Sequence, residues 1–336
     1  MSKKIIAAFD GGYGNCKFTG GRDETSGAII TDSIPSIVTT PSSLDKGERL
    51  LASMDVVKVR VDGVEFEVGK DTIHSVHVGD GRSLNQDYAN SPYYMALFHG
   101  TLHYMKHQEV DLLVAGLPVN AYWRDKAMLA KRLEGSHIFP NGKIVVIQRC
   151  VVIPQPMGGF MDHMAATSNF SRTANVLVLD PGYFTMDFLV CHGLKPIKER
   201  SGSFPGGMSN ILAKLSEEVS KKLNVPITST NTLEQSAKNG WMFEAFGKPY
   251  DLKQHLPAVA PLTDLIAQQV VSKIGNVIDI SRVILVGGGA DFFLPAFKKV
   301  FPNHTIEIAT NPAFANVRGF FLFGERHSKN TLTSDG

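Results

Sequence analysis

The chain has 336 residues, of which 43% are hydrophobic and 20% are charged, and its formal net charge is +2. Its length exceeds one ordinary hydrophobic core and predicts two domains, and its composition is that of a soluble globular protein. The near-neutral charge gives no reason to expect a nucleic-acid or membrane surface. We also find no apolar run of the roughly 18 residues that a membrane helix needs, no signal-peptide core and no CxxC pair, so we expect a cytoplasmic protein with reduced thiols.

Predicted strands and helices alternate along the chain, which indicates an α/β architecture. Residues 33–90 differ from the rest, because Pro, Ser and Gly punctuate short β segments there, and we interpret them as a β-rich insertion on a first domain. Within it, Asp62-Gly63 joins two runs of alternating β-branched residues, which predicts a hairpin over 56–68. Helices are expected over 92–107, 122–133, 160–167, 208–223, 262–278 and 316–323, and residues 326–336 are expected to form a flexible tail.

A nine-residue pattern occurs twice, as Asp10-Gly-Gly-Tyr-Gly-Asn-Cys-Lys-Phe18 and as Asp180-Pro-Gly-Tyr-Phe-Thr-Met-Asp-Phe188. Each copy follows an apolar run and reads as a strand, an acidic residue, a glycine turn and a second strand. The tip of such a hairpin presents a carboxylate and exposed backbone N–H groups. The repeat predicts a duplicated fold that closes two hairpins on an anion. The alternative is two ordinary glycine turns, each stabilised by its Asp.

The first hairpin has the composition of a phosphate-binding turn. Gly11, Gly12 and Gly14 allow the close approach by which N–H groups wrap a phosphate, and Lys17 could pair with the same anion. Asp10 and its counterpart in the second hairpin would repel phosphates unless a cation intervened. Mg²⁺ suits that arrangement, because it keeps its waters and bridges the phosphates of a nucleotide.

Other glycine-rich segments lie where open α/β sheets bind ligands. Gly287-Gly-Gly-Ala290 directly follows a buried strand, and Gly202–Gly207 precedes a helix. Gln155 lies between two prolines at the end of a strand, where an amide could orient an attacking water or could be a polar turn residue. The chain contains no G-x-x-x-x-G-K-[ST] motif, which excludes a P-loop, and no G-x-G-x-x-G follows the first strand, which argues against a dinucleotide fold.

His99, His103 and His107 follow one another at a spacing of four residues and would line one helix face. No Cys, Asp or Glu completes a recognisable metal-ligand pattern around them. We therefore expect a solvated or interface face here rather than a metal site.

Taken in order, the two hairpins and Gly287–Ala290 resemble the phosphate-1, phosphate-2 and adenosine motifs of the actin/Hsp70/sugar-kinase ATPase superfamily. Residues 154–156 and 311–319 look like its two connecting hinge segments. The turn Gly12-Tyr-Gly-Asn-x-Lys17 and the run Ala115-Gly-Leu-Pro-Val119 look most like the ParM/StbA group of plasmid-segregation actins. The resemblance covers roughly residues 1–325.

The resemblance implies two actin-like (ribonuclease-H-like) domains that flank a nucleotide cleft: residues 1–167 as domain I, 168–310 as domain II and 311–325 as a return segment to domain I. It also implies an ATPase with Mg²⁺, with GTP as the alternative nucleotide. Asp10 and Asp180 would hold Mg²⁺ through water and, with Gln155 positioning the attacking water, would be the catalytic residues. The residues implied to contact the nucleotide are Gly11, Gly12, Tyr13, Gly14, Asn15, Lys17, Gly182, Tyr183, Phe184, Thr185, Gly206, Gly207, Gly287, Gly288, Gly289 and Ala290.

Members of the ParM/StbA group polymerise into polar double-stranded filaments, hydrolyse ATP slowly and push plasmid copies apart through an adaptor bound to centromere-like DNA. The resemblance therefore implies self-association and an adaptor protein, with no direct contact to DNA or membrane. Two alternatives remain open. A small-molecule kinase of the same superfamily would need a catalytic Asp, for which Asp187 and Asp162 are the candidates. A cell-shape or division actin would show a membrane-binding amphipathic end, which the polar C-terminus does not match.

Overall fold

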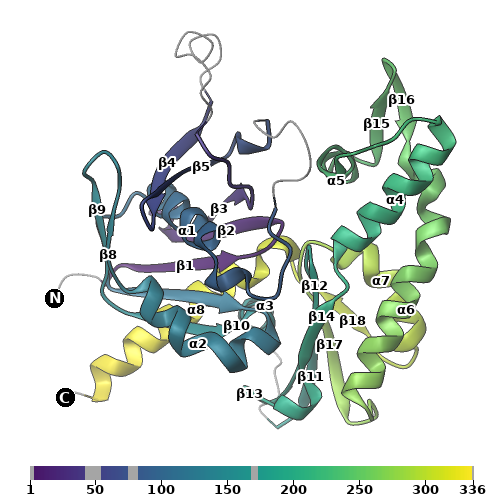
Figure 1. The fold of residues 1–336 in the computed structure, drawn as a ribbon. Helices are drawn as coiled ribbons and strands as arrows, with labels where there is room; N and C mark the ends of the chain where they lie inside the picture. The colour runs from purple at the N-terminus through teal and green to yellow at the C-terminus, as the bar shows by residue number, and fades with distance from the viewer. Residues whose placement is uncertain (1–3, 42–53, 75–81, 168–172, 335–336) are drawn as a thin grey trace.

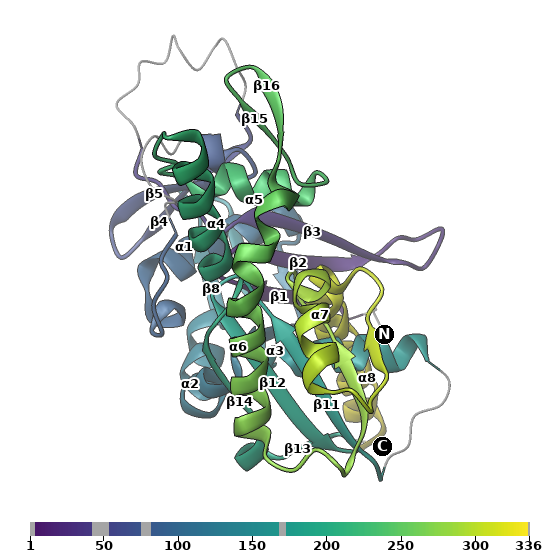
Figure 2. The ribbon, with the colours of Figure 1, turned by 90° about the vertical axis from the view of Figure 1, so that its right-hand side faces the viewer.

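The computed structural model describes residues 4–41, 54–74, 82–167 and 173–334 of the chain. Two β-sheets, one in each half of the sequence, stand on either side of a central layer of two helices (Figures 1 and 2). We refer to the half with the first sheet as domain I and to the half with the second sheet as domain II. The predicted boundary at 167/168 falls at residues 168–172, which lie outside the described residues.

The sheet of domain I combines a parallel part with an antiparallel part. Three of its strands run parallel, and the chain then turns back through two antiparallel strands. Its two most central parallel strands are mostly apolar and almost wholly buried, as expected for strands covered on both faces. In spatial order the strands are β10 (Cys150–Pro154), β7 (Leu112–Leu117), β1 (Ile6–Gly11), β2 (Asn15–Arg22) and β3 (Ile29–Pro35).

The sheet of domain II repeats this pattern. Strand β11 pairs antiparallel with β12, which follows it, and parallel with β17, just as β1 pairs with β2 and with β7. The strands are β13 (Lys195–Pro196), β12 (Thr185–His192), β11 (Asn175–Pro181), β17 (Ile280–Leu285) and β18 (Ile306–Ile308), with β14 (Gly202–Pro205) also paired to β12.

Strand register confirms that the two nine-residue patterns fold alike. Asp10 lies opposite Lys17 in the first hairpin, and Asp180 lies opposite Asp187 in the second. These are the positions that the sequence repeat aligns. The duplication predicted from the sequence is therefore a duplication of structure.

Alternate side chains of each sheet point into two different hydrophobic cores. In domain I, Ala7 and Phe9 point into an outer core with helices α1 and α2, whereas Ala8 points into the central layer. In domain II the outer core is covered by α4, α6 and α7. The α-helices are α1 (Pro92–Met105), α2 (Val119–Leu133), α3 (Gln155–Ala166), α4 (Met208–Leu223), α5 (Thr230–Lys238), α6 (Leu256–Ile274), α7 (Ala290–Val300) and α8 (Ala315–Ser334).

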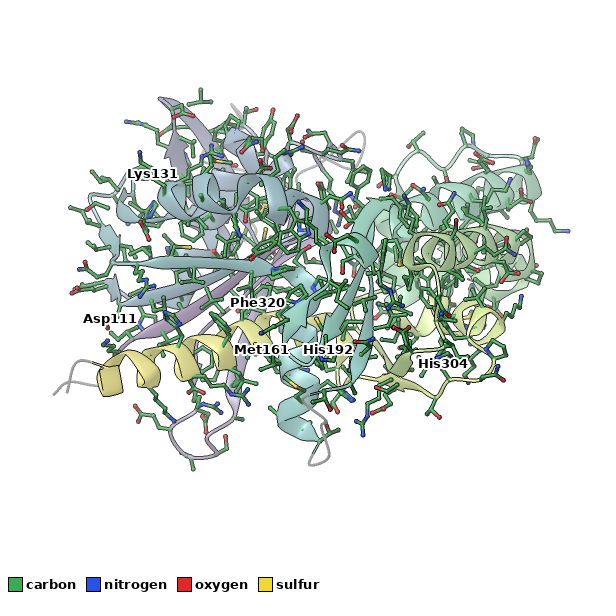
Figure 3. All side chains as sticks on the ribbon, turned by 90° about the horizontal axis from the view of Figure 1, so that it is seen from below. Asp111, Lys131, Met161, His192, His304 and Phe320 are labelled. Atoms are coloured by element: carbon green, nitrogen blue, oxygen red, sulfur yellow. The ribbon has the colours of Figure 1, made fainter. Side chains whose placement is uncertain are left out.

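Helices α3 and α8 form the central layer that joins the two sheets (Figure 1). Met161 of α3 and Phe320 of α8, both labelled in Figure 3, are buried in it. The two helices cross at very short range, because a Cβ on Gly319 would lie 1.7 Å from the backbone oxygen of Gly158. This crossing is tight enough to require glycine, and it fixes how the two domains meet.

Short elements complete the fold. The hairpin predicted around Asp62-Gly63 is confirmed, and both turn residues have positive φ angles of 50° and 79°. It packs on α1, while a second hairpin projects from domain II (Figure 2). The short strands are β4 (Val56–Val61), β5 (Val64–Gly69), β6 (Glu109–Val110), β8 (Gly135–Ile138), β9 (Ile144–Ile147), β15 (Met242–Ala245) and β16 (Lys248–Asp251). The 3-10 turns are η2 (Thr72–His74), η3 (Tyr88–Asn90), η4 (Lys198–Arg200), η5 (Leu252–His255) and η6 (Pro312–Phe314).

The helix predicted over 208–223 is confirmed at both ends, whereas other boundaries were wrong. Helix α3 begins at Gln155, five residues before the predicted start, because a proline at the second position of a helix fits its first turn. The helix predicted over 262–278 is α6, Leu256–Ile274. Helices α5 and α7 and the hairpin β15–β16 were not predicted.

Helix α8 continues to Ser334, so residues 326–334 of the predicted flexible tail are helical. Arg22 of β2 holds Glu325 in a two-pronged ion pair with distances of 2.8 and 2.7 Å. On either side of Glu325, the rings of Phe323 and His327 stack with their centroids 5.8 Å apart. These contacts continue the helix into a segment whose composition is polar. Residues 335 and 336 lie outside the described residues.

Candidate nucleotide-binding site

The first hairpin carries Asp10 at the end of β1, with only 2% of its surface exposed. Its turn is held from behind by Ser36, which donates its hydroxyl to the Gly12 oxygen at 2.5 Å and its N–H to the Gly14 oxygen at 3.0 Å. Gly11 faces away from the turn, and a Cβ there would lie 2.5 Å from the Tyr94 ring. The glycines thus shape the turn.

The second hairpin carries Asp180 at the end of β11, where it is 5% exposed. The start of α4 anchors its turn, because Met208 donates its N–H to the Gly182 oxygen at 3.0 Å. Gly207 allows this approach, since a Cβ there would lie 2.6 Å from the same oxygen. Gly206 and Gly207, which we expected to face the nucleoside, therefore pack behind the turn.

The segment after β17 closes over the Asp180 carboxylate. Gly287 has φ +83°, and a Cβ at this position would lie 2.1 Å from Asp180 Oδ1. Two independent reasons thus require glycine here. Gly289 donates its N–H to the Pro181 oxygen at 2.9 Å, and Ala290 is buried at the start of α7. Gly289 thus supports the second turn from behind.

Polar side chains of the central layer hold the two carboxylates. Gln155, the first residue of α3, donates its amide to Asp10 Oδ1 at 2.7 Å, and Lys17 Nζ lies 3.5 Å from Asp10 Oδ2. Asn316, at the start of α8, donates its amide to Asp180 Oδ2 at 2.7 Å. Each carboxylate is therefore fixed by an amide from a different central helix.

Burial governs the charge state of the second hairpin. It raises the pKa of Asp180 to about 6, with Asn316 lowering it and the charge of Asp10 raising it. Asp187, opposite Asp180, has its pKa raised to about 7, again mainly by burial and then by Asp180. The Asp187 carboxylate accepts the N–H of Val119 at 2.7 Å. A divalent cation would offset this accumulation of negative charge.

The two hairpins open onto one cleft of about 840 Å³ between the domains. One end of the cleft is polar and the other is largely apolar. The predicted site residues that line it are Asp10, Gly12, Tyr13, Gly14, Asn15, Lys17, Gln155, Asp180, Gly182, Tyr183, Thr185, Gly287 and Gly288. The remaining predicted residues, Gly11, Phe184, Gly206, Gly207, Gly289 and Ala290, do not line it. Phe184 instead packs on the Tyr13 ring, with the ring centroids 4.9 Å apart.

Sequence reasoning missed the apolar end of the cleft. Helices α4 to α7 and the residue Trp241 converge there, so that a flat ring could lie between side chains from segments far apart in sequence. The apolar residues are Met208, Leu212, Ala237, Trp241, Leu256, Ala260, Phe292 and Pro295, with Glu234, Thr263 and Asp291 as polar neighbours. The residues share no motif, and only their helical periodicity could have suggested that they face a common space.

The three histidines spaced four residues apart, two in α1 and one just after it, have different surroundings. His99 hydrogen-bonds His137 of β8 with 3.1 Å between their ring nitrogens, and burial lowers the pKa of His99 to about 4. His107 lies 2.6 Å from the Gly20 oxygen, and His103 is exposed. Among the described residues, no three His, Cys, Asp or Glu side chains are placed to hold a metal ion. Of the predicted solvated or interface face, only His103 is exposed.

Family models match both halves of the chain. The model described as the N-terminal domain of actin-like proteins matches residues 8–158, and the C-terminal model of the archaeal, MreB-like actin homologue matches residues 178–299. The chain is an actin-like protein. The predicted superfamily and the predicted pair of actin-like domains are therefore confirmed.

Individual relatives agree with this family along almost the whole chain. An archaeal actin homologue from Thermoplasma volcanium is 24% identical over 340 residues, which cover 96% of this actin-like protein and 99% of the relative. The crystal structure of an archaeal actin homologue in complex with ADP has a TM-score of 0.74 at 20% identity, over 96% of this chain and 99% of that one. A subunit of the 15-stranded ParM filament from Clostridium botulinum has a TM-score of 0.72 at 20% identity, over 97% and 100%.

The three cysteines of the actin-like protein, Cys16, Cys150 and Cys191, are free and buried. None of the helices in the described part of the chain could span a lipid bilayer.

Proposed function

We propose that this actin-like protein binds ATP with Mg²⁺ in the cleft between its domains and hydrolyses it. The observation that carries the proposal is the convergence of two acidic glycine hairpins and Gly287 on one cleft of about 840 Å³. The polar end would take the phosphates and the apolar end the base, with GTP as the alternative nucleotide. The archaeal actin homologue that was crystallised in complex with ADP has a similar fold, which supports a nucleotide as the ligand.

The residues at the polar end of the cleft would have three roles: binding Mg²⁺, binding the phosphates and positioning the attacking water. Asp10 and Asp180 would hold Mg²⁺ through water, and the ion would neutralise charge on the phosphates. The backbone of Gly12–Asn15 and Gly182–Thr185, together with Lys17, would hold the phosphates. Gln155 would position the attacking water, and its hydrogen bond to Asp10 fixes the side chain at the polar end.

We further propose that the protein polymerises with ATP into a polar, double-stranded filament, and that the filament segregates plasmid DNA through a DNA-bound adaptor. Support comes from the likeness to a ParM filament subunit over nearly the whole chain and from the Gly12–Lys17 turn. The near-neutral charge agrees with a route to DNA through an adaptor, and with no direct contact to membrane. Such a filament would act in the cytoplasm.

Light scattering at micromolar protein tests the filament. Scattering should rise on addition of ATP with Mg²⁺ and should stay low with ADP or with EDTA. Asp180→Ala should abolish the rise, whereas Asp264→Ala, which removes an exposed ion pair with Lys299, should leave it intact. An unchanged baseline with ATP and Mg²⁺ would contradict polymerisation.

A small-molecule kinase is the second candidate. Asp187 lines the cleft, and a pKa of about 7 suits a general base. However, its carboxylate is already bound to the Val119 N–H. Asp162, the other candidate base, forms a two-pronged ion pair with Arg318 and does not line the cleft. ATP turnover without any rise in scattering, stimulated by a small hydroxyl compound, would favour the kinase.

A further inference from the structure

Arg82 lies in domain I, in the segment between η2 and η3, and its side chain is 1% exposed. It donates to the oxygen of Gly14, at the first hairpin turn, over 3.3 Å. It also donates to the hydroxyl of Tyr183, in the second hairpin turn, over 3.2 Å, and its guanidinium lies 4.5 Å from the centre of that ring. One side chain thus touches both hairpin turns.

The same guanidinium reaches α5, which lies on the side of domain II nearer to domain I (Figure 1) and lines the cleft. It forms an ion pair with Glu234 at 3.0 Å and donates to the side-chain oxygen of Asn231. Both partners are buried, and Glu234 lines the cleft. Arg82 therefore connects domain I to a helix of domain II at a distance from the central helices.

An arginine stays charged at any physiological pH, so its burial is favourable only while its donors have acceptors. The acceptors of Arg82 come from three separate elements on the two sides of the cleft. Moving the domains apart would separate the guanidinium from Asn231 and Glu234. The open state would therefore lose charge-assisted hydrogen bonds that the closed state has.

We propose that Arg82 is a latch between the domains that holds the cleft closed and slows the release of bound nucleotide. This inference rests on the proposed nucleotide binding. Arg82 does not line the cleft, so it acts through the position of α5 and of the hairpin turns and not as a ligand of the nucleotide.

The test measures release of tritium-labelled ADP into excess unlabelled ADP by rapid filtration. Arg82→Ala and Asn231→Ala should each speed release, the former by about tenfold or more, since hydrogen bonds to a charged group are lost. The double variant should release ADP no faster than Arg82→Ala, because both changes break the same contact. Arg60→Ala, which removes an exposed ion pair with Glu65 on the β4–β5 hairpin, is the matched control and should not change release.

Small-angle scattering without nucleotide gives a second, independent measurement. Arg82→Ala should have a larger radius of gyration than the wild type at unchanged helical content. Release rates within about twofold of the wild type, or effects of the two single changes that multiply in the double variant, would overturn the latch. If Arg82→Ala fails to fold, Asn231→Ala decides the question, because it removes a neutral partner.

The outcomes distinguish a failure of the latch from a failure of the proposed nucleotide binding. A wild type that retains no labelled ADP would contradict nucleotide binding itself. A wild type that retains ADP, with unchanged release and unchanged dimensions in both variants, would contradict only the latch.

Discussion

Replacing Asp180 by Asn should stabilise the protein while abolishing its use of Mg²⁺-nucleotide. The side chain is 5% exposed and carries its charge without a cationic hydrogen-bond partner among the contacts described above. Asn has nearly the same shape, can still accept the hydrogen bond from Asn316, and is neutral. The substitution therefore removes the cost of burying a charge while leaving the packing of the hairpin intact.

The pKa of Asp180 gives the size of the effect. Burial raises it from 3.8 to about 6, and this difference corresponds to about 3 kcal/mol. Below pH 3.8 the carboxyl is neutral in the folded and unfolded states, so Asp180 costs nothing. Between pH 3.8 and 6 the unfolded chain loses its proton first, so the wild type loses stability as the pH rises, and the full cost is present above pH 6.

The assay is urea denaturation of the nucleotide-free protein at pH 8 and at pH 4.5. At pH 8, Asp180→Asn should be more stable than the wild type by up to about 3 kcal/mol, and at pH 4.5 the difference should shrink to about 1 kcal/mol. Asp264→Asn, at an exposed ion pair, should change stability by less than about 0.5 kcal/mol at either pH. A destabilised Asp180→Asn at pH 8, or an equal gain at both pH values, would show that the buried charge of Asp180 does not lower the stability of the wild type.

Three further substitutions test other parts of the site. Gly287→Ala should cost about 1–3 kcal/mol of stability and weaken ATP binding in a titration, because φ is +83° and the new Cβ would lie 2.1 Å from Asp180 Oδ1. Gln155→Ala should slow ATP hydrolysis by about 10- to 100-fold in a phosphate-release assay while ATP still binds. Gly319→Ala should cost more than about 4 kcal/mol in urea denaturation, because its Cβ would lie 1.7 Å from the Gly158 oxygen.

Matched glycine substitutions serve as controls. A Cβ on Gly288 or on Gly21 would meet no atom within 4 Å, so Gly288→Ala and Gly21→Ala should cost much less stability than Gly287→Ala and Gly319→Ala. Equal losses of stability in the two pairs of variants would show that close contact of the new Cβ is not the cause. If Gln155→Ala abolished ATP binding, its role would be to hold Asp10 and the hinge, and the proposed role in hydrolysis would fail.

The polar end of the site could be predicted from the sequence because its chemistry is local. Each hairpin is a contiguous segment, and the repeat of Asp10 by Asp180 shows that two such segments belong together. Gly287 could likewise be recognised, because it directly follows a buried strand. Turn chemistry also predicted the hairpin at Asp62-Gly63.

The parts of the fold and of the site that were not predicted depend on contacts between segments far apart in the sequence. The apolar end of the cleft is assembled from four helices, and no spacing within any one of them indicates a common ligand. Gly206 and Gly207 were misplaced because sequence does not show on which side of a turn a helix start will pack. Helix α8 was predicted too short because the ion pair between Glu325 and Arg22 joins residues 303 positions apart.

Equilibrium titration of the intact chain with ATP, in Mg²⁺ and again in EDTA, is the most direct test of nucleotide binding in the cleft. We expect saturable binding at one site in Mg²⁺, clear weakening in EDTA, and loss of the Mg²⁺ effect in Asp180→Asn. An absence of saturable ATP or GTP binding in the presence of Mg²⁺ would show that the cleft is not a nucleotide site.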